Sequence, residues 1–114
     1  MLADAVPYSG QTAEHRRVVV EIRRDALVRV RATLQHYSCA TFGEIGPLSL
    51  TAPGRARIAR DGSFRFVAGP AAQRLTVLGH RRAGGRVTGT LRVHGTIATG
   101  QRCASLTVRF TARR

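Results

Sequence analysis

The residues in this sequence with the clearest capacity for chemistry are its arginines. All 19 basic residues are arginine, only 6 residues are acidic, and the formal net charge at pH 7 is +13. Several arginines alternate with apolar residues, a two-residue period that places them on the solvent side of β-strands. If those strands are neighbours, they form a sheet face that can hold phosphates or carboxylates bidentately. The predicted anion-binding residues are Arg17, Arg29, Arg31, Arg65, Arg86, Arg92 and Arg109.

The strong positive charge indicates partners of opposite sign. A field of this size raises encounter rates with polyanions, which include nucleic acid, anionic lipid headgroups and acidic cell-wall polymers. The sequence has no lysine and no asparagine, whose codons are AT-rich. A GC-rich genome would therefore also favour arginine over lysine. In the alternative interpretation, the arginines form a solvated surface that binds no ligand.

Aromatic residues bear on the choice among these partners, because single-stranded nucleic acid needs aromatic side chains on the basic face. Phe64, Phe66 and Phe110 fall instead on the apolar side of their strands. We therefore expect an anionic cell-envelope polymer as the partner. The alternative is an intracellular, OB-like nucleic-acid-binding barrel.

The sequence contains few residues that could form a catalytic site. No serine stands in a Gly-x-Ser-x-Gly turn, and Asp25 and Asp61 lie in tight turns. Glu21 and Glu44 are the acidic residues that remain outside turns and the N-terminus for paired-carboxylate chemistry. We expect a non-enzymatic domain; a small hydrolase would need a pocket that joins Glu21 or Glu44 to a histidine.

Metal binding is also not expected. The four histidines are His15, His36, His80 and His94, and no two are at i, i+2 or i, i+4. In the strand register expected below, His94 faces Arg74 or Ala72 and not His80. The sequence thus predicts neither a metal site nor a cofactor.

Two cysteines, Cys39 and Cys103, lie far apart in the chain and indicate one disulfide or two unrelated thiols. Cys39 is on the parity opposite Leu34, and Cys103 is on the parity opposite Leu106. Isolated core cysteines would share the apolar phase, so this pattern favours a disulfide. Such a bond would contribute about 4 kcal/mol and implies an oxidising compartment.

The strand around which the chain is organised spans residues 86–97, where apolar residues and glycines occupy one parity and polar residues the other. A strand at 74–80, with Leu75 and Val77 inward, leads into it. To keep the inward residues of both strands paired, the connecting loop must have an odd number of residues. This pairs Val77 with Gly89 or Leu91.

The N-terminal third predicts three strands. Residues 5–12 are expected to form a short edge strand with Pro7 at its start. Residues 16–23 and 28–34 form a hairpin that pairs Ile22 with Val28 and Val20 with Val30.

The remaining segments are less regular. Residues 36–53, punctuated by glycine and proline, predict a long loop that crosses between two sheets, with a short strand at 48–51. The turn at 60–62 predicts a hairpin with Gly62 left-handed and Ile58 opposite Phe64. The final strand, residues 102–112, is expected to point Ala104, Leu106, Val108 and Phe110 inward.

Together these segments predict an all-β protein, a single-domain antiparallel β-sandwich or barrel of about eight short strands. The domain spans residues 1–114, with residues 1–6 as a disordered leader. We expect no helix longer than about two turns and no membrane span.

The order of several short motifs resembles small secreted β-rich domains of high-GC bacteria. The motifs are Tyr8-Ser9-Gly10-x-Thr12, Cys39, Asp61-Gly62-Ser63-Phe64, Gly79, Arg86-Val87-Thr88-Gly89-Thr90-Leu91-Arg92-Val93, Cys103 and Val108-x-Phe110-x-Ala112. The resemblance implies export, a disulfide between Cys39 and Cys103, and no catalytic residues. From this resemblance we expect a secreted or cell-envelope protein. The first residues lack the positive and apolar regions of an export signal, which makes the cytoplasm the alternative.

Overall fold

The computed structural model describes residues 4–114, and those residues contain β-strands and no helix. The strands are β1 (Val6–Thr12), β2 (Arg17–Arg23), β3 (Ala26–Cys39), β4 (Gly43–Arg57), β5 (Ser63–Ala68), β6 (Arg74–Arg82), β7 (Arg86–Thr96), β8 (Arg102–Ser105) and β9 (Val108–Arg113). The predicted all-β class is confirmed. Within the described residues, no helix is long and apolar enough to cross a membrane.

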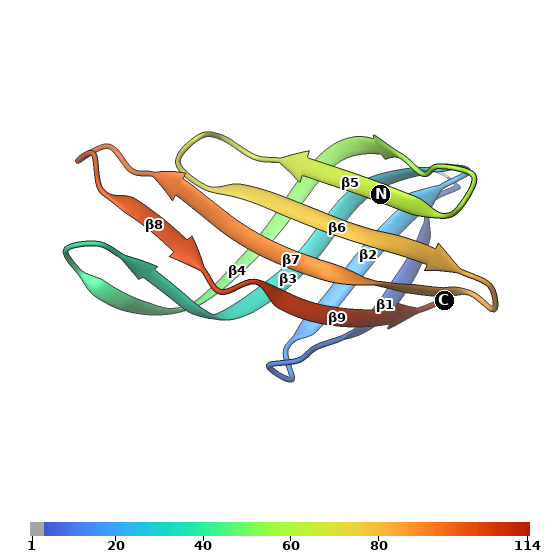
Figure 1. Ribbon diagram of the computed structural model, residues 1–114, viewed down its shortest axis with the longest axis horizontal. Helices are drawn as coiled ribbons and strands as arrows, with labels where there is room; N and C mark the ends of the chain where they lie inside the picture. Colours follow the sequence, from blue (N-terminus) through green and yellow to red (C-terminus); the bar gives the residue numbers. More distant parts are fainter. Residues whose placement is uncertain (1–3) are drawn as a thin grey trace.

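The strands form two layers that cross steeply (Figure 1). We call β1 to β4 the N-terminal layer and β5, β6, β7 and β9 the C-terminal layer; the hydrogen-bonded order is β4-β3-β2-β1-β9-β7-β6-β5. Strand β8 pairs with both β3 and β7, which closes a six-strand ring of β1, β2, β3, β8, β7 and β9. The molecule is therefore a closed antiparallel barrel with β4, β5 and β6 as additional strands.

The core lies between the layers and follows the predicted two-residue period. Val18, Val20 and Ile22 are buried, as expected, and Val77 pairs with Leu91 across a three-residue loop. The largest fully buried side chains are Phe66, Leu27, Leu34, Leu75, Leu91, Val18, Val20, Val30, Val77, Val87 and Val93. Their removal from water is the main favourable term in folding.

Glycines in the C-terminal layer make room for aromatic rings. The register aligns Phe64, Gly79, Gly89 and Phe110 across β5, β6, β7 and β9. A Cβ on Gly79 would come within 2.8 Å of the Phe64 ring, and a Cβ on Gly89 within 2.2 Å of the Leu78 carbonyl oxygen. Only glycine fits this close approach.

Strand β1 is not the edge strand that the sequence suggested. It pairs with β2 from Val6 and with β9 from Ser9, so it lies inside the sheet. Pro7 is tolerated because it precedes the part of β1 that pairs with β9. Val6 belongs to this strand, whereas residues 1–3 of the expected leader lie outside the described residues.

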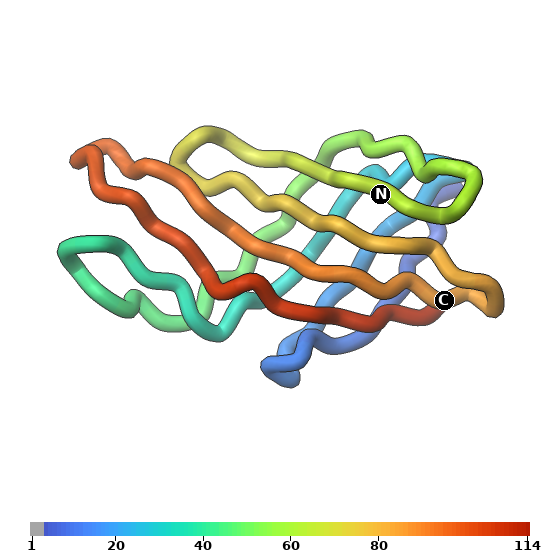
Figure 2. Tube along the Cα trace, in the orientation of Figure 1, coloured from blue at the N-terminus to red at the C-terminus, as the bar shows by residue number. Residues whose placement is uncertain are grey.

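The predicted loop at 36–53 is wrong, except that its expected short strand at 48–51 lies within β4. β3 continues to Cys39, and β4 begins at Gly43 and pairs with β3 over its length. Pro47 and Pro53 are accommodated because β4 is an edge strand. The β3–β4 hairpin extends past the rest of the N-terminal layer (Figure 2).

The crossing between layers occurs instead at the turn before β5. Gly62 has the predicted positive φ, at 91°. However, β4 pairs with β3 and β5 with β6, so Ile58 and Phe64 do not face each other in a ladder. The turn chemistry was predicted correctly, and the partner strand was not.

Two bulges change the predicted phase of β3. Ile22 pairs with Leu27 and not with Val28, because the register shifts between Glu21 and Ile22; Val20 pairs with Val30 as predicted. A second shift follows Leu34, and beyond it Tyr37 is buried. A bulge adds one residue to one strand, which reverses the inward parity.

The predicted final strand is divided into β8 and β9. Ser105 is buried, and its hydroxyl accepts a hydrogen bond from the Val93 amide and donates one to the Leu106 carbonyl. Leu106 is 61% exposed, and Ala104 lies outward between the buried Cys103 and Ser105, so the predicted inward orientation of both is wrong. Val108 and Phe110 are buried as expected.

Candidate anion-binding face

The seven predicted arginines lie on two faces and not on one. Arg17, Arg29 and Arg31 project from the outer face of the N-terminal layer. The guanidinium of Arg29 lies 3.5 Å from the Glu21 carboxylate, so part of this positive charge is compensated within the protein.

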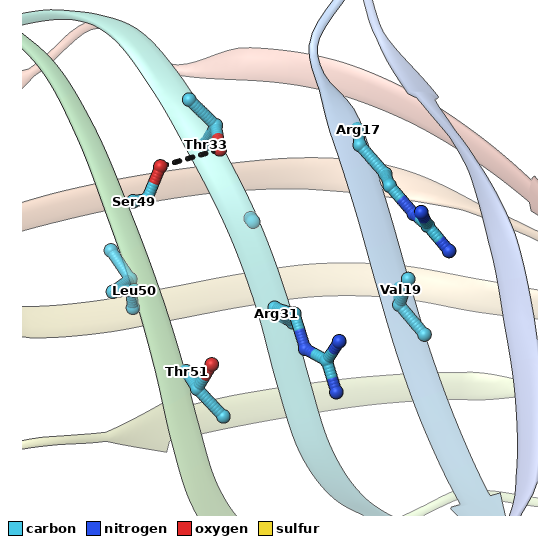
Figure 3. Close-up of a pocket in the computed structure, with 8 residues that line it drawn as sticks. Arg17, Val19, Arg31, Thr33, Ser49, Leu50 and Thr51 are labelled. Carbon is cyan, nitrogen blue, oxygen red and sulfur yellow. Dashed lines mark hydrogen bonds between the residues drawn. The ribbon is translucent and has the colours of Figure 1, made fainter.

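Arg17 and Arg31 border a shallow groove of about 320 Å³ on this outer face. Figure 3 shows both side chains on the same side of the sheet, with Val19 between them. The Thr33 and Ser49 hydroxyls form a hydrogen bond at the groove's other end. Val19, outward-facing yet 6% exposed, forms part of the lining, which explains why it departed from the predicted alternation.

The other four arginines, Arg65, Arg86, Arg92 and Arg109, lie on the outer face of the C-terminal layer. Registers without bulges place Arg65 and Arg109 in one row across the four strands, Arg92 in the next row, and Arg86 two rows away on the other side. Three arginines that sequence reasoning missed share this face, since Arg82 pairs with Arg86, Arg86 with Arg113, and Arg74 with His94. They stand at strand ends, where alternation gives no signal.

We call this surface the arginine face; its residues are Arg65, Arg74, Arg82, Arg86, Arg92, Arg109 and Arg113. Its four strands contain no acidic residue. Asp61, in the turn at its rim, accepts hydrogen bonds from the amide and hydroxyl of Ser63. Those hydrogen bonds, with a smaller contribution from nearby His80, lower the pKa of Asp61. The positive charge of the face is thus uncompensated by carboxylates on its strands.

Opposed like charges make this arrangement costly in the free protein. Arg82, Arg86 and Arg113 are consecutive cross-strand neighbours, and like charges directly opposite destabilise a sheet. The Nε of Arg86 is buried and has no hydrogen-bond partner among the described residues. An anion on this face would relieve the repulsion and supply acceptors.

Comparisons with known proteins identify no relative, so the interpretation rests on the geometry of the arginine face. No family model, curated protein or solved structure matches the chain.

The cysteines form the disulfide that the sequence favoured, Cys39–Cys103. The parity argument for it was wrong, because both residues are buried, with exposures of 4% and 2%. The bulge after Leu34 and the phase change at Ser105 bring both side chains into the core.

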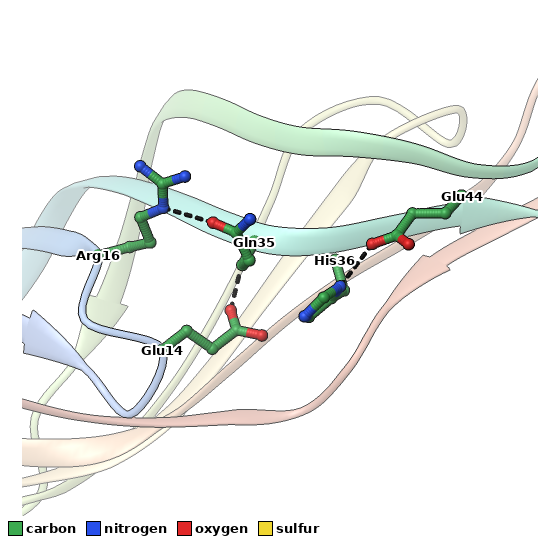
Figure 4. A network of polar contacts seen from close by, with 5 residues as sticks. All are labelled: Glu14, Arg16, Gln35, His36 and Glu44. Carbon is green, nitrogen blue, oxygen red and sulfur yellow. Dashed lines mark hydrogen bonds and ion pairs between the residues drawn. The ribbon is translucent and has the colours of Figure 1, made fainter.

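One of the two candidate acids pairs with a histidine, and the other lies elsewhere. Glu44 bonds His36 at the β3–β4 hairpin, where both side chains are more than half exposed (Figure 4). That hydrogen bond raises the pKa of His36, assisted by the charges of Glu44 and Glu14. Glu21 is on another strand and faces Arg29.

The remaining potential ligands are also dispersed. Within residues 4–114 there is no group of three or more His, Cys, Asp or Glu side chains placed to hold a metal.

Of the six tyrosine and phenylalanine residues, Phe42 alone is exposed, and it lies at the β3–β4 turn. No phenylalanine or tyrosine therefore accompanies the arginines on their face, where the aromatic rings are those of His80 and His94.

Proposed function

We propose that this protein is a non-enzymatic β-domain of the cell envelope or extracellular space that binds an anionic polymer through the arginine face. The observation that carries the proposal is a four-strand surface with seven arginines and no carboxylate on its strands. Arginine holds phosphate and carboxylate groups bidentately, and the long spread of the charge suits an extended ligand.

Two further observations support this proposal over an intracellular nucleic-acid binder. The Cys39–Cys103 disulfide is compatible with an oxidising compartment. The arginine face also lacks exposed phenylalanine and tyrosine side chains, on which single-stranded bases stack.

Retention on immobilised heparin, a model polyanion, tests the proposal. Because the contacts are electrostatic, we expect the protein to be retained at low salt and to elute as salt screens the charges. Absence of retention at low ionic strength would overturn the proposal. Stronger retention on single-stranded DNA than on heparin at equal salt would favour the nucleic-acid alternative.

A further inference from the structure

One end of the arginine face is hollowed, where β7 and β8 meet. The hollow has a volume of about 400 Å³, and its polar lining includes Arg92, His94, Thr96 and Arg102. In the β7–β8 ladder, His94 faces Ala104 and Thr96 faces Arg102. The small side chain of Ala104 leaves space between the larger cationic groups, and Ala71 from the β5–β6 loop contributes to the lining.

The position of the surrounding backbone is fixed. The amide of Thr96 donates a hydrogen bond to the Ala71 carbonyl, and a Cβ on Gly95 would lie 2.2 Å from the Ala72 carbonyl oxygen. Arg102 directly precedes Cys103, whose disulfide holds β8 against β3. The cationic side chains therefore project from a rigid frame.

Thr96, which faces Arg102, is four residues from Arg92, or about 13 Å along the strand, so a shared ligand requires both long arginine side chains to extend toward His94 at the middle of the hollow. Arg92 and His94 are two residues apart on the same face of β7, about 6.6 Å along the strand. Arg102 is the diagonal neighbour of His94, at roughly 7–8 Å. Arg74 faces His94 from β6 and adds a further positive charge beside the hollow.

We propose that this hollow is a discrete site for a phosphate group. A carboxylate has two oxygens in one plane and is satisfied by a single bidentate arginine. A phosphate carries more acceptor oxygens in a tetrahedral arrangement, so it can accept from Arg92, Arg102 and the Thr96 hydroxyl together. The hollow is larger than one phosphate, which leaves room for the group to which the phosphate is attached. The site deepens the proposed function, since it names phosphate as the anion of the polymer.

The test is a titration of the oxidised full chain with inorganic phosphate, with sodium chloride used to hold ionic strength constant. We expect saturable binding that Arg102→Gln and Arg92→Gln each weaken about tenfold, the value of one charge-assisted contact. Arg65→Gln is the matched control, because it removes one charge from the same face but outside the hollow. The Arg102 side chain is exposed, so its replacement should leave the fold intact.

Two results would overturn the site. One is no phosphate binding beyond that of chloride at equal ionic strength; the other is an equal loss in Arg65→Gln and Arg102→Gln. Diethyl phosphate serves as a second probe: if it binds as well as inorganic phosphate, the ligand is an internal phosphodiester, and if it binds more weakly, a terminal phosphate. Heparin retention without saturable phosphate binding would remove the site alone, whereas phosphate binding without retention would remove the polymer proposal alone.

Discussion

Cys39 lies directly opposite Cys103 in the β3–β8 ladder, and a disulfide joins them. Strand β8 has only four residues, yet it links β3 of the N-terminal layer to β7 of the C-terminal layer. The disulfide therefore reinforces the shortest strand of the closed ring, and it also fixes the strand that carries Arg102.

Removal of this disulfide should destabilise the protein substantially. The bond joins residues separated by 64 positions, and closure of such a loop contributes about 4 kcal/mol in the chain-entropy treatment. We expect the Cys39→Ala/Cys103→Ala variant to melt on the order of 15 °C below the oxidised protein. Calorimetry with and without reductant measures this. The wild type should lose a similar amount on reduction and the variant nothing; an unchanged wild-type melting temperature would contradict the assignment.

Gly89 should tolerate no β-branched side chain. A Cβ at this position would lie 2.2 Å from the Leu78 carbonyl oxygen, and the Phe64 ring packs over the neighbouring Gly79. We expect Gly89→Val to cost about 3 kcal/mol, at the upper end of overpacking costs. Thr90→Val, on the outer face of the same strand, should stay within about 0.5 kcal/mol. Urea unfolding compares the two variants, and equal stabilities would show that the glycine row is not required.

The His36 titration should depend on Glu44. The hydrogen bond to Glu44 raises the pKa of His36 above its ordinary value of 6.5. A raised folded-state pKa means that the pair stabilises the fold fully below pH 6.5 and loses this effect as pH rises through the raised value. In an NMR titration, Glu44→Gln should lower the midpoint toward 6.5. Glu14→Gln should lower it less, because Glu14 acts only through its charge; an unchanged midpoint in Glu44→Gln would refute the pairing.

The alternation of apolar residues was sufficient to predict most strands but not the changes of phase within them. Val18, Val20 and Ile22 were predicted correctly because they keep the two-residue period, although Val19 between them is also buried. The register shifts after Glu21 and Leu34 are bulges, and the position of a bulge depends on which strand is the partner. Alternation within one strand does not reveal it. The glycines and prolines of β4 were taken for a loop, because the sequence does not reveal that this strand lies at an edge.

For the candidate site, the sequence predicted which way each arginine points from its own strand, but not which strands are neighbours. Alternation places Arg65, Arg92 and Arg109 toward solvent, and the structure agrees. It does not reveal which strands are neighbours, so the separation of Arg17 and Arg31 onto the other layer could not be foreseen. The hollow around Arg102 depends on β8 pairing with β7, a contact between segments whose register is set by the disulfide and the core.

Matched triple variants test the role of the arginine face most directly, through their affinity for heparin at about 0.1 M salt. Arg65→Ser/Arg92→Ser/Arg109→Ser alters the arginine face, and Arg17→Ser/Arg29→Ser/Arg31→Ser alters the other layer; each removes three of the charges that give +13. At about 1 kcal/mol per arginine near an anionic surface, the first variant should lose roughly a hundredfold in affinity. The second should lose less than about tenfold, because its residues lie on the opposite face. Equal losses in the two variants would mean that net charge alone governs binding and would contradict the account.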